Sequence, residues 1–276
     1  MSPGGFILLS ALLHAAWNTF AKRTSSPYYE VLGIMGFATV FSLFFIPFFP
    51  GPLFVSADSF FWALASGFFE GGYVLTLAIS LSQSSLGKAY IMMRGSAMIL
   101  VWAISALFLG ETVNLFSMVG IVCVLIGLVL TSYTYQDARS NQLFPFLCGI
   151  CIAGYHLCYG RSLAHGANPA ALFSAALWIG LPGIVLFMNP TQRQLFKEKI
   201  KSGWKMTSIG GLISALSFLL FLLGLRHAEA GLALTLRNTS VVFAQIFACL
   251  IGERISKNQW VGAIFVAFGA SLLYPF

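Results

Sequence analysis

Long runs of apolar residues, separated by short polar, glycine and proline clusters, make up most of the 276-residue chain. A helix needs about 20 mostly apolar residues to cross a bilayer, and ten runs approach that length. We therefore predict an all-α integral membrane protein with ten transmembrane helices. The predicted helices cover residues 4–22, 28–49, 58–82, 86–109, 113–134, 144–165, 168–187, 204–227, 230–252 and 257–275.

The composition excludes a soluble protein. Only 8% of the residues are charged, against roughly a quarter in ordinary soluble domains. The first run has no basic residues before it and ends in Lys22-Arg23, so it is predicted to be a retained span and not a cleaved signal peptide. The connecting segments are too short for a folded extramembrane domain, which places the function inside the membrane part.

Rare residues repeat along the chain at a constant offset of 142 positions. In this apolar composition such matches indicate a duplicated unit, with a first five-helix repeat at 1–134, a connecting loop at 135–143 and a second repeat at 144–276. An odd number of spans returns the second copy inverted, as in alternating-access transporters. The matching pairs are His14/His156, Pro27/Pro169, Trp62/Trp204, Gly110-Glu111/Gly252-Glu253, Gly120/Gly262 and Gly127/Gly269.

Basic residues are distributed unequally between the two sides of this topology. Eleven Lys and Arg fall on one side, two (Arg161 and Arg226) fall on the other, and two lie within predicted spans. The richer side is predicted to be cytoplasmic, which places both termini outside the cytoplasm, with the loop 188–203 as the main anchor. We therefore interpret the basic residues behind the net charge of +7 as setting the orientation of the protein in the membrane, and we assign no role in nucleic-acid binding.

Three segments together resemble a known family: His14-Ala-Ala-Trp17-Asn18-Thr-Phe-Ala-Lys22, Leu109-Gly110-Glu111 and Ile251-Gly252-Glu253, each Gly-Glu preceding a glycine-spaced helix. The whole chain is similar to EamA-type members of the drug/metabolite transporter superfamily. The resemblance implies a secondary transporter of small metabolites in the bacterial inner (plasma) membrane. It also implies a central cavity lined by helices 1, 3, 4, 6, 8 and 9. Family members are commonly drawn with cytoplasmic termini, whereas the distribution of basic residues here predicts termini outside the cytoplasm.

Two arginines at membrane depth are the first candidates for substrate binding, because charged groups there are costly and usually functional. Arg94 and Arg237 lie 16 and 15 residues before Gly110 and Gly252, at near-equivalent places in the two repeats. A guanidinium binds carboxylate or phosphate through a two-pronged fork. We predict that both arginines bind an anionic group, with Asn238 as a further contact; the alternative is bridging between helices.

Glu70 lies near the middle of the third predicted helix. We predict that it contacts substrate and carries the coupling proton, or provides a counter-charge for a cationic group. The alternative is a structural pair with Arg94. Tyr73, three residues further on, and Tyr90, one turn before Arg94, are predicted substrate contacts, with ordinary aromatic packing as the alternative.

Polar and aromatic residues recur at the repeat-related histidines. His14, Trp17 and Asn18 lie on one side of the first helix, and His156 and Tyr159 lie on the sixth. Such a stripe would be wasted on lipid, so we predict that all five line the cavity. The alternative for each histidine is a buried hydrogen-bonding role.

No metal or other cofactor is predicted. Cys148, Cys151, His156 and Cys158 have spacing reminiscent of zinc ligands, but at about 100° per residue His156 points roughly 140° away from the face shared by Cys151 and Cys158. The five cysteines all fall in predicted spans and indicate no disulfide framework. Gly120, Gly127, Gly262 and Gly269 predict that the fifth and tenth helices pack together.

The polar residues gather near mid-depth, which favours a binding site between two gates over a channel with polar rings along its path. No interfacial catalytic cluster is present, so no enzymatic activity is predicted. The leading function is transport of an amino acid or related zwitterion, possibly proton-coupled. The alternatives are a phosphorylated or other anionic metabolite, or export of a cationic, amphipathic drug. The expected partners are a small-molecule substrate and the lipid bilayer, with the protein a monomer or weak homodimer.

Overall fold

The computed structural model describes residues 1–83, 91–110, 114–132, 143–250 and 255–273. All regular structure in these ranges is helical, and each of the ten predicted segments overlaps one or more of the helical elements. Tyr90, Glu111 and the Gly252-Glu253 motif lie outside the described residues. The eight longest apolar helices are each of a length that can cross a membrane.

The first helix of the chain begins with both a capping residue and a proline. Ser2 accepts a hydrogen bond from the Gly5 amide, and Pro3 opens the first helix, where its missing N–H costs nothing. The elements are α1 (Pro3–Lys22), α2 (Pro27–Phe45), the 3₁₀ turn η1 (Ile46–Phe48), α3 (Ala57–Gln83), the π-helical η2 (Ile91–Gly95), α5 (Ser96–Ile104), the π-helical η3 (Ser105–Leu109) and α6 (Leu115–Ser132).

The second half follows the same order. Asn168 caps its second helix by accepting from the amides of Ala170 and Ala171. The elements are α7 (Leu143–Ala164), α8 (Pro169–Leu186), α9 (Pro190–Leu225), α10 (Ala230–Arg237), α11 (Ser240–Leu250) and α12 (Lys257–Leu273).

The prediction of a loop at 188–203 is wrong, because α9 already begins at Pro190. Asn189 and Gln192 form a reciprocal capping box, in which each side chain accepts from the other residue's amide. Pro190 occupies the first helical position, and this start signal outweighs the polarity that suggested a loop. The helix is 36 residues long, well beyond what one crossing requires.

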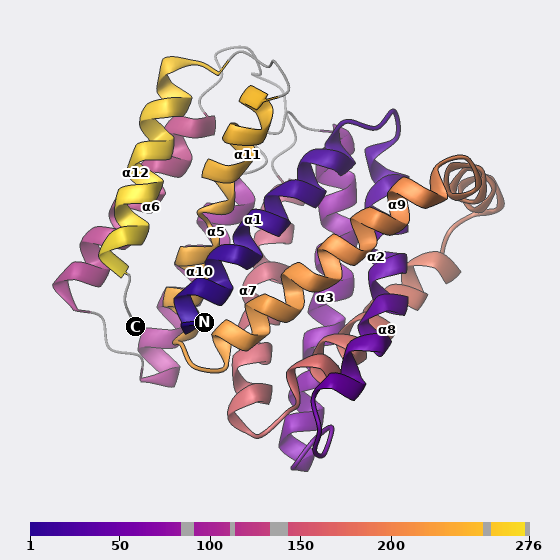
Figure 1. The fold of residues 1–276 in the computed structure, drawn as a ribbon, viewed down its shortest axis with the longest axis horizontal. Helices are drawn as coiled ribbons and strands as arrows, with labels where there is room; N and C mark the ends of the chain where they lie inside the picture. Colours follow the sequence, from indigo (N-terminus) through magenta and orange to yellow (C-terminus); the bar gives the residue numbers. More distant parts are fainter. Residues whose placement is uncertain (84–90, 111–113, 133–142, 251–254, 274–276) are drawn as a thin grey trace.

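Five helix pairs form the main contacts: α1 with α9, α2 with α9, α3 with α7, α3 with α8, and α6 with α12. Glycines permit the closest approaches. A Cβ added to Gly71 of α3 would lie 2.6 Å from the carbonyl oxygen of Gly180 in α8. Figure 1 shows α6 and α12 side by side at one edge of the bundle.

The predicted packing of the fifth and tenth helices through glycine is confirmed. A Cβ added to Gly127 would lie 2.6 Å from the Gly262 carbonyl oxygen, and one on Gly269 would lie 2.6 Å from that of Gly120. In a membrane, where lipid tails are as apolar as leucine, such backbone proximity supplies much of the helix–helix attraction.

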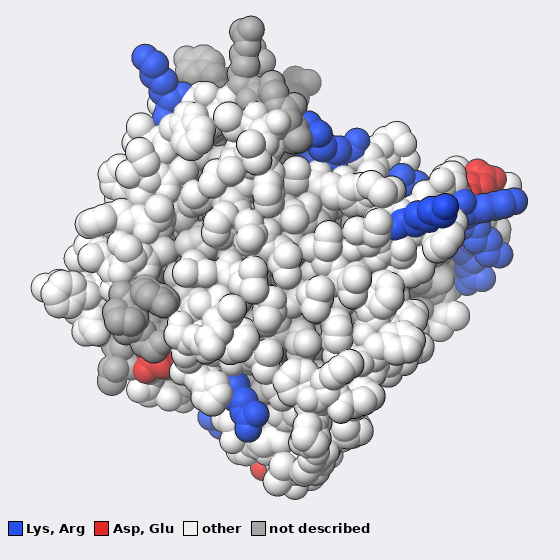
Figure 2. Space-filling view, viewed as in Figure 1, with Lys and Arg blue, Asp and Glu red and all other residues white. Residues whose placement is uncertain are grey.

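The surface has the character expected of a bilayer protein. Many large apolar side chains are exposed, among them Phe68 (75%), Phe108 (77%) and Phe187 (92%). In Figure 2 the charged side chains of the visible face lie near the ends of the molecule, with an uncharged area between them. This distribution places the hydrocarbon layer around the middle of the bundle.

Replacing Gly127 by alanine should destabilise the protein by ~1–3 kcal/mol, because the new methyl group collides with the backbone of α12. The matched control is Gly36→Ala in α2, where an added Cβ meets nothing within 4 Å. That control should unfold at the same temperature or higher, since alanine favours helix by about 1 kcal/mol. Thermal unfolding in detergent measures both, and equal shifts would contradict the packing role of Gly127.

Candidate functional site

A buried polar cluster occupies the interior where α1, α3, η2, α7, α9 and α10 meet. Ten of the eleven predicted substrate-contact residues belong to it, all 7% exposed or less; the eleventh, Tyr90, lies outside the described residues. The ten are His14, Trp17, Asn18, Glu70, Tyr73, Arg94, His156, Tyr159, Arg237 and Asn238. The fold therefore brings together residues that are up to 224 positions apart in the sequence.

Arg237 is a fully buried charged group in this cluster. Its Cζ lies 4.5 Å from the ring centroid of Phe218 and 4.3 Å from that of Phe221, both on α9. Its Nη2 donates to Nδ1 of His14 at 3.4 Å. Because a desolvated guanidinium is attracted to aromatic faces, the two phenylalanines fix the position of the charge while leaving donors available in its plane.

Both arginines lie where their helix departs from regular α-helix. Arg94 is within the π-helical η2, and Arg237 ends α10, with two residues between it and the start of α11 at Ser240. Asn238 lies in that break and accepts a 3.5 Å hydrogen bond from Nη1 of Arg94. π-Bulges and broken transmembrane helices are typical of functional sites, and here they occur at near-equivalent places in the two halves of the sequence.

Glu70 is the acidic residue of the cluster and lies on α3. Tyr159 of α7 donates to its Oε2 at 3.0 Å. The alternative in which Glu70 pairs with Arg94 is not found among the described residues. Tyr73 packs with its ring centroid 5.3 Å from that of Tyr155, which in turn lies 5.4 Å from Tyr159.

The two repeat-related histidines both face this cluster. His156 donates from Nδ1 to the Ile152 carbonyl at 2.8 Å and packs 4.8 Å from Phe221, which leaves Nε2 as an acceptor in the neutral ring. His14 packs edge-on against Trp17 at 5.2 Å, and Asn18 donates to the His14 carbonyl at 2.8 Å. Within the described ranges, no three His, Cys, Asp or Glu side chains are grouped as a metal site requires.

Several buried polar atoms of the cluster have no hydrogen-bond partner among the described residues. They are Nε and Nη1 of Arg237, Oε1 of Glu70, Nε2 of His156 and Nε1 of Trp17. Such orphaned groups are rare in native proteins, because each one costs the free energy of lost hydration. A ligand that supplied acceptors to Arg237 and a donor to Glu70 would recover that cost.

The cavity beside the buried cluster is small. A cavity lined by His14, Asn18, Tyr73, Leu77, Met93, Arg94 and Ile152 measures about 10 Å³, the space of roughly one water molecule. The cavity that the described residues enclose at the cluster is thus too small for a metabolite, which can enter there only if the helices move apart.

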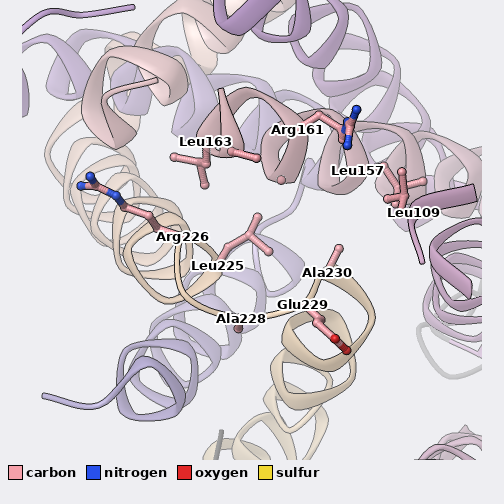
Figure 3. A pocket seen from close by; sticks show the side chains of 11 residues that line it. Leu109, Leu157, Arg161, Leu163, Leu225, Arg226, Ala228, Glu229 and Ala230 are labelled. Carbon is pink, nitrogen blue, oxygen red and sulfur yellow. The ribbon is translucent and has the colours of Figure 1, made fainter. Parts of the chain in front are cut away.

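A second cavity, of about 210 Å³, lies at the end of the molecule where α7, α9 and α10 converge. Figure 3 shows Leu163 and Leu225 lining it, with the charged ends of Arg226 and Glu229 at its edges, pointing away from its middle. Leu225 follows Phe221 by one helical turn, so this cavity is one turn of α9 away from the Arg237 cluster. It contains Arg161 and Arg226, the two cations assigned to the sparsely charged side.

Sequence reasoning missed Phe218 and Phe221. With 27 phenylalanines in the chain, neither residue stands out, and their i, i+3 spacing is ordinary in an apolar helix. Their role emerges only from the packing of α9 against the break after Arg237. A buried arginine without an acidic partner is the signal that could have suggested aromatic neighbours.

Comparison with known proteins gives a family and a fold. The EamA-like transporter family matches residues 3–133 and again 141–274. An uncharacterized transporter in the cobO 3′ region of a Sinorhizobium species is 32% identical over 74 residues, which are 26% of this chain and 52% of that protein. The match therefore spans about half the length of this relative. A crystal structure of a protein with 15% identity superposes with a TM-score of 0.72, covering 99% of this chain and 96% of the other.

The contact between the Arg237 guanidinium and the ring of Phe221 should contribute measurably to the free energy of unfolding. Phe221→Leu and Arg237→Gln, made singly and together, should show a coupling of ~1–2 kcal/mol in thermal or denaturant unfolding. Phe187→Leu serves as the control, since Phe187 is 92% exposed and should show no coupling with Arg237→Gln. Additive effects of the Phe221 and Arg237 changes would contradict the geometry.

Proposed function

Because the chain belongs to the EamA-like transporter family, we propose that it is a secondary transporter that binds a small zwitterionic metabolite, an amino acid or a close relative, at the Arg237 cluster. The observation that carries this proposal is a fully buried guanidinium whose Nε and Nη1 have no protein acceptor in the described structure. Both N–H groups can donate charge-assisted hydrogen bonds to the oxygens of a carboxylate.

Glu70 and the neighbouring tyrosines suit the positively charged end of such a substrate. Glu70 keeps Oε1 unpartnered while Tyr159 occupies Oε2, so the carboxyl group can accept from an ammonium group or carry a proton. The rings of Tyr73 and Tyr155 lie beside it and can surround a cation. The division of positive charge at Arg94 and Arg237 from negative charge at Glu70 fits a zwitterion.

Alternating access is the mechanism that we propose, with the two family-matched stretches as inverted repeats. The contact pattern supports it: α1 with α9 corresponds to α7 with α3, α2 with α9 corresponds to α8 with α3, and α6 with α12 corresponds to itself. A closed cluster next to an end cavity of about 210 Å³ fits a state between two open forms.

A phosphorylated or other anionic metabolite is the second candidate, favoured by the excess of two arginines over one glutamate in the cluster. A cationic, amphipathic drug is a weaker candidate, since it would use Glu70 and the tyrosines but leave Arg237 unpartnered. Substrate competition distinguishes the three classes.

Arg94→Gln and Arg237→Gln should each abolish uptake and exchange of an anionic or zwitterionic substrate, because its charge would stay unpaired in a dry cavity, at a cost of several kcal/mol. Glu70→Gln should retain exchange but lose accumulation against a gradient, together with the pH dependence of transport. Counterflow and gradient-driven uptake in liposomes, measured side by side, separate these effects.

The control for these variants is Lys257→Gln, which removes one positive charge at the start of α12, outside the cluster. It should transport like the wild type. If Glu70→Gln instead loses binding as fully as Arg94→Gln, Glu70 positions the substrate site and carries no proton. Normal transport by all three cluster variants would show that the site lies elsewhere.

We also propose that the protein resides in the bacterial inner membrane with both termini outside the cytoplasm, on the basis of the charge asymmetry. A phosphatase fused after Phe276 should be active, and a fluorescent reporter that matures only in the cytoplasm should stay dark. The same two reporters inserted after Gln194 should give the reverse pattern. Reversal of both results would refute this orientation.

A further inference from the structure

Four cations form a row along the first turns of α9. Arg193, Lys197, Lys201 and Lys205 follow one another at intervals of four residues, and all four side chains are exposed. Residues four apart lie on neighbouring turns of the same side of a helix. Figure 2 shows the Lys and Arg side chains gathered at the end of the molecule where α9 begins in Figure 1. These four residues are called the basic stripe below.

The basic stripe lies at the height of lipid headgroups. Residues 206–225 supply 20 uncharged, mostly apolar positions, the length that one crossing requires, so the charged turns before them are outside the hydrocarbon layer. Trp204 and Met206 are 53% and 57% exposed at this boundary, and Nζ of Lys205 lies 5.9 Å from the ring centroid of Trp204. An exposed tryptophan beside lysine is characteristic of the interface between membrane and water.

The turns that carry the stripe are held rigidly against α2. Nζ of Lys199 lies 2.8 Å from Oε2 of the buried Glu30, and Thr207 donates to Oε1 of the same carboxylate at 2.8 Å. A Cβ added to Gly33 would lie 2.5 Å from Cδ1 of Ile200, so the helices are in close contact there. Figure 1 shows the first turns of α9 nearly end-on, whereas the rest of the helix crosses the bundle, so the stripe turns away from the direction of the span.

The positive charge of the stripe is not neutralised within the described protein. Glu198, the acidic residue among these turns, accepts a hydrogen bond from Gln194. Arg193 donates to the Leu186 carbonyl. The ion pair found in the described ranges joins Lys199, which is not part of the stripe, to Glu30. Lys197, Lys201 and Lys205 therefore present ammonium groups without a carboxylate partner.

From these observations we propose that the basic stripe is a binding surface for anionic phospholipid headgroups. Ammonium groups are point charges that bind phosphate without a fixed orientation, which suits headgroups that exchange within a leaflet. The position at the membrane surface, the neighbouring Trp204 and the rigid attachment to α2 favour lipid over a soluble acidic partner. This proposal does not depend on the substrate or on the transport mechanism.

The test measures lipid binding to purified wild-type protein in a neutral detergent at low salt, through the unfolding temperature. Phosphatidylglycerol should raise this temperature and phosphatidylcholine should not. In the variant Lys197→Gln/Lys201→Gln/Lys205→Gln, the half-saturating concentration of phosphatidylglycerol should rise roughly 100-fold, as expected for three lysines near an anionic surface. Raising the salt to about 1 M should suppress the wild-type shift.

The matched control removes three cations elsewhere, in Arg161→Gln/Arg226→Gln/Lys257→Gln, and should keep the wild-type response to phosphatidylglycerol. A second readout is quenching by brominated lipids, taken as the difference between wild type and Trp204→Phe. Brominated phosphatidylglycerol should quench the Trp204 signal more strongly than brominated phosphatidylcholine. An unchanged lipid response in the stripe variant, or an equal loss in the control, would overturn the proposal, as would an equal shift from inorganic phosphate.

Discussion

The burial of the Arg237 guanidinium in the interior of the bundle is the constraint on which the site depends. A charge at this depth is expensive, and no carboxylate contacts it among the described residues. Phe218 and Phe221 provide favourable faces above the guanidinium plane, and His14 accepts from one nitrogen. Compensation is incomplete, since Nε and Nη1 remain without partners. A transporter gains from this arrangement, because the missing free energy is available for binding an anionic group.

Small residues position the acidic residue of the site. Gly71 and Gly72 directly follow Glu70 on α3; a Cβ on Gly71 would collide with Gly180 of α8, and one on Gly72 would lie 2.8 Å from Sγ of Cys151 in α7. The close approach of α3 to α7 brings Glu70 within hydrogen-bonding distance of Tyr159. Glycine packing in this part of the molecule therefore serves the chemistry of the site as well as helix association.

Hydrophobic periodicity and rare residues were sufficient to predict the helices and the polar residues of the buried cluster, but not Phe218 and Phe221. Arginine, glutamate and histidine are so costly at membrane depth that their positions alone indicated Arg94, Arg237, Glu70, His14 and His156. The contacts within the cluster could not be predicted. The partner of Glu70 is Tyr159 and not Arg94, and the π-helical turn at Arg94 and the break after Arg237 have no signature in the local sequence. The early start of α9 was predictable from the Asn189–Gln192 capping box, but polarity concealed it.

The central claim is that Arg237 provides the anion site of the substrate. A thermal-shift screen of the purified protein against amino acids, sugar phosphates and organic cations, run in parallel with Arg237→Gln, tests it most directly, because a ligand of the folded state raises the unfolding temperature. The account predicts that at least one compound with a carboxylate or phosphate stabilises the wild type and that its effect vanishes in Arg237→Gln. Stabilisation by cations alone, or by an anionic compound equally in both proteins, would contradict it.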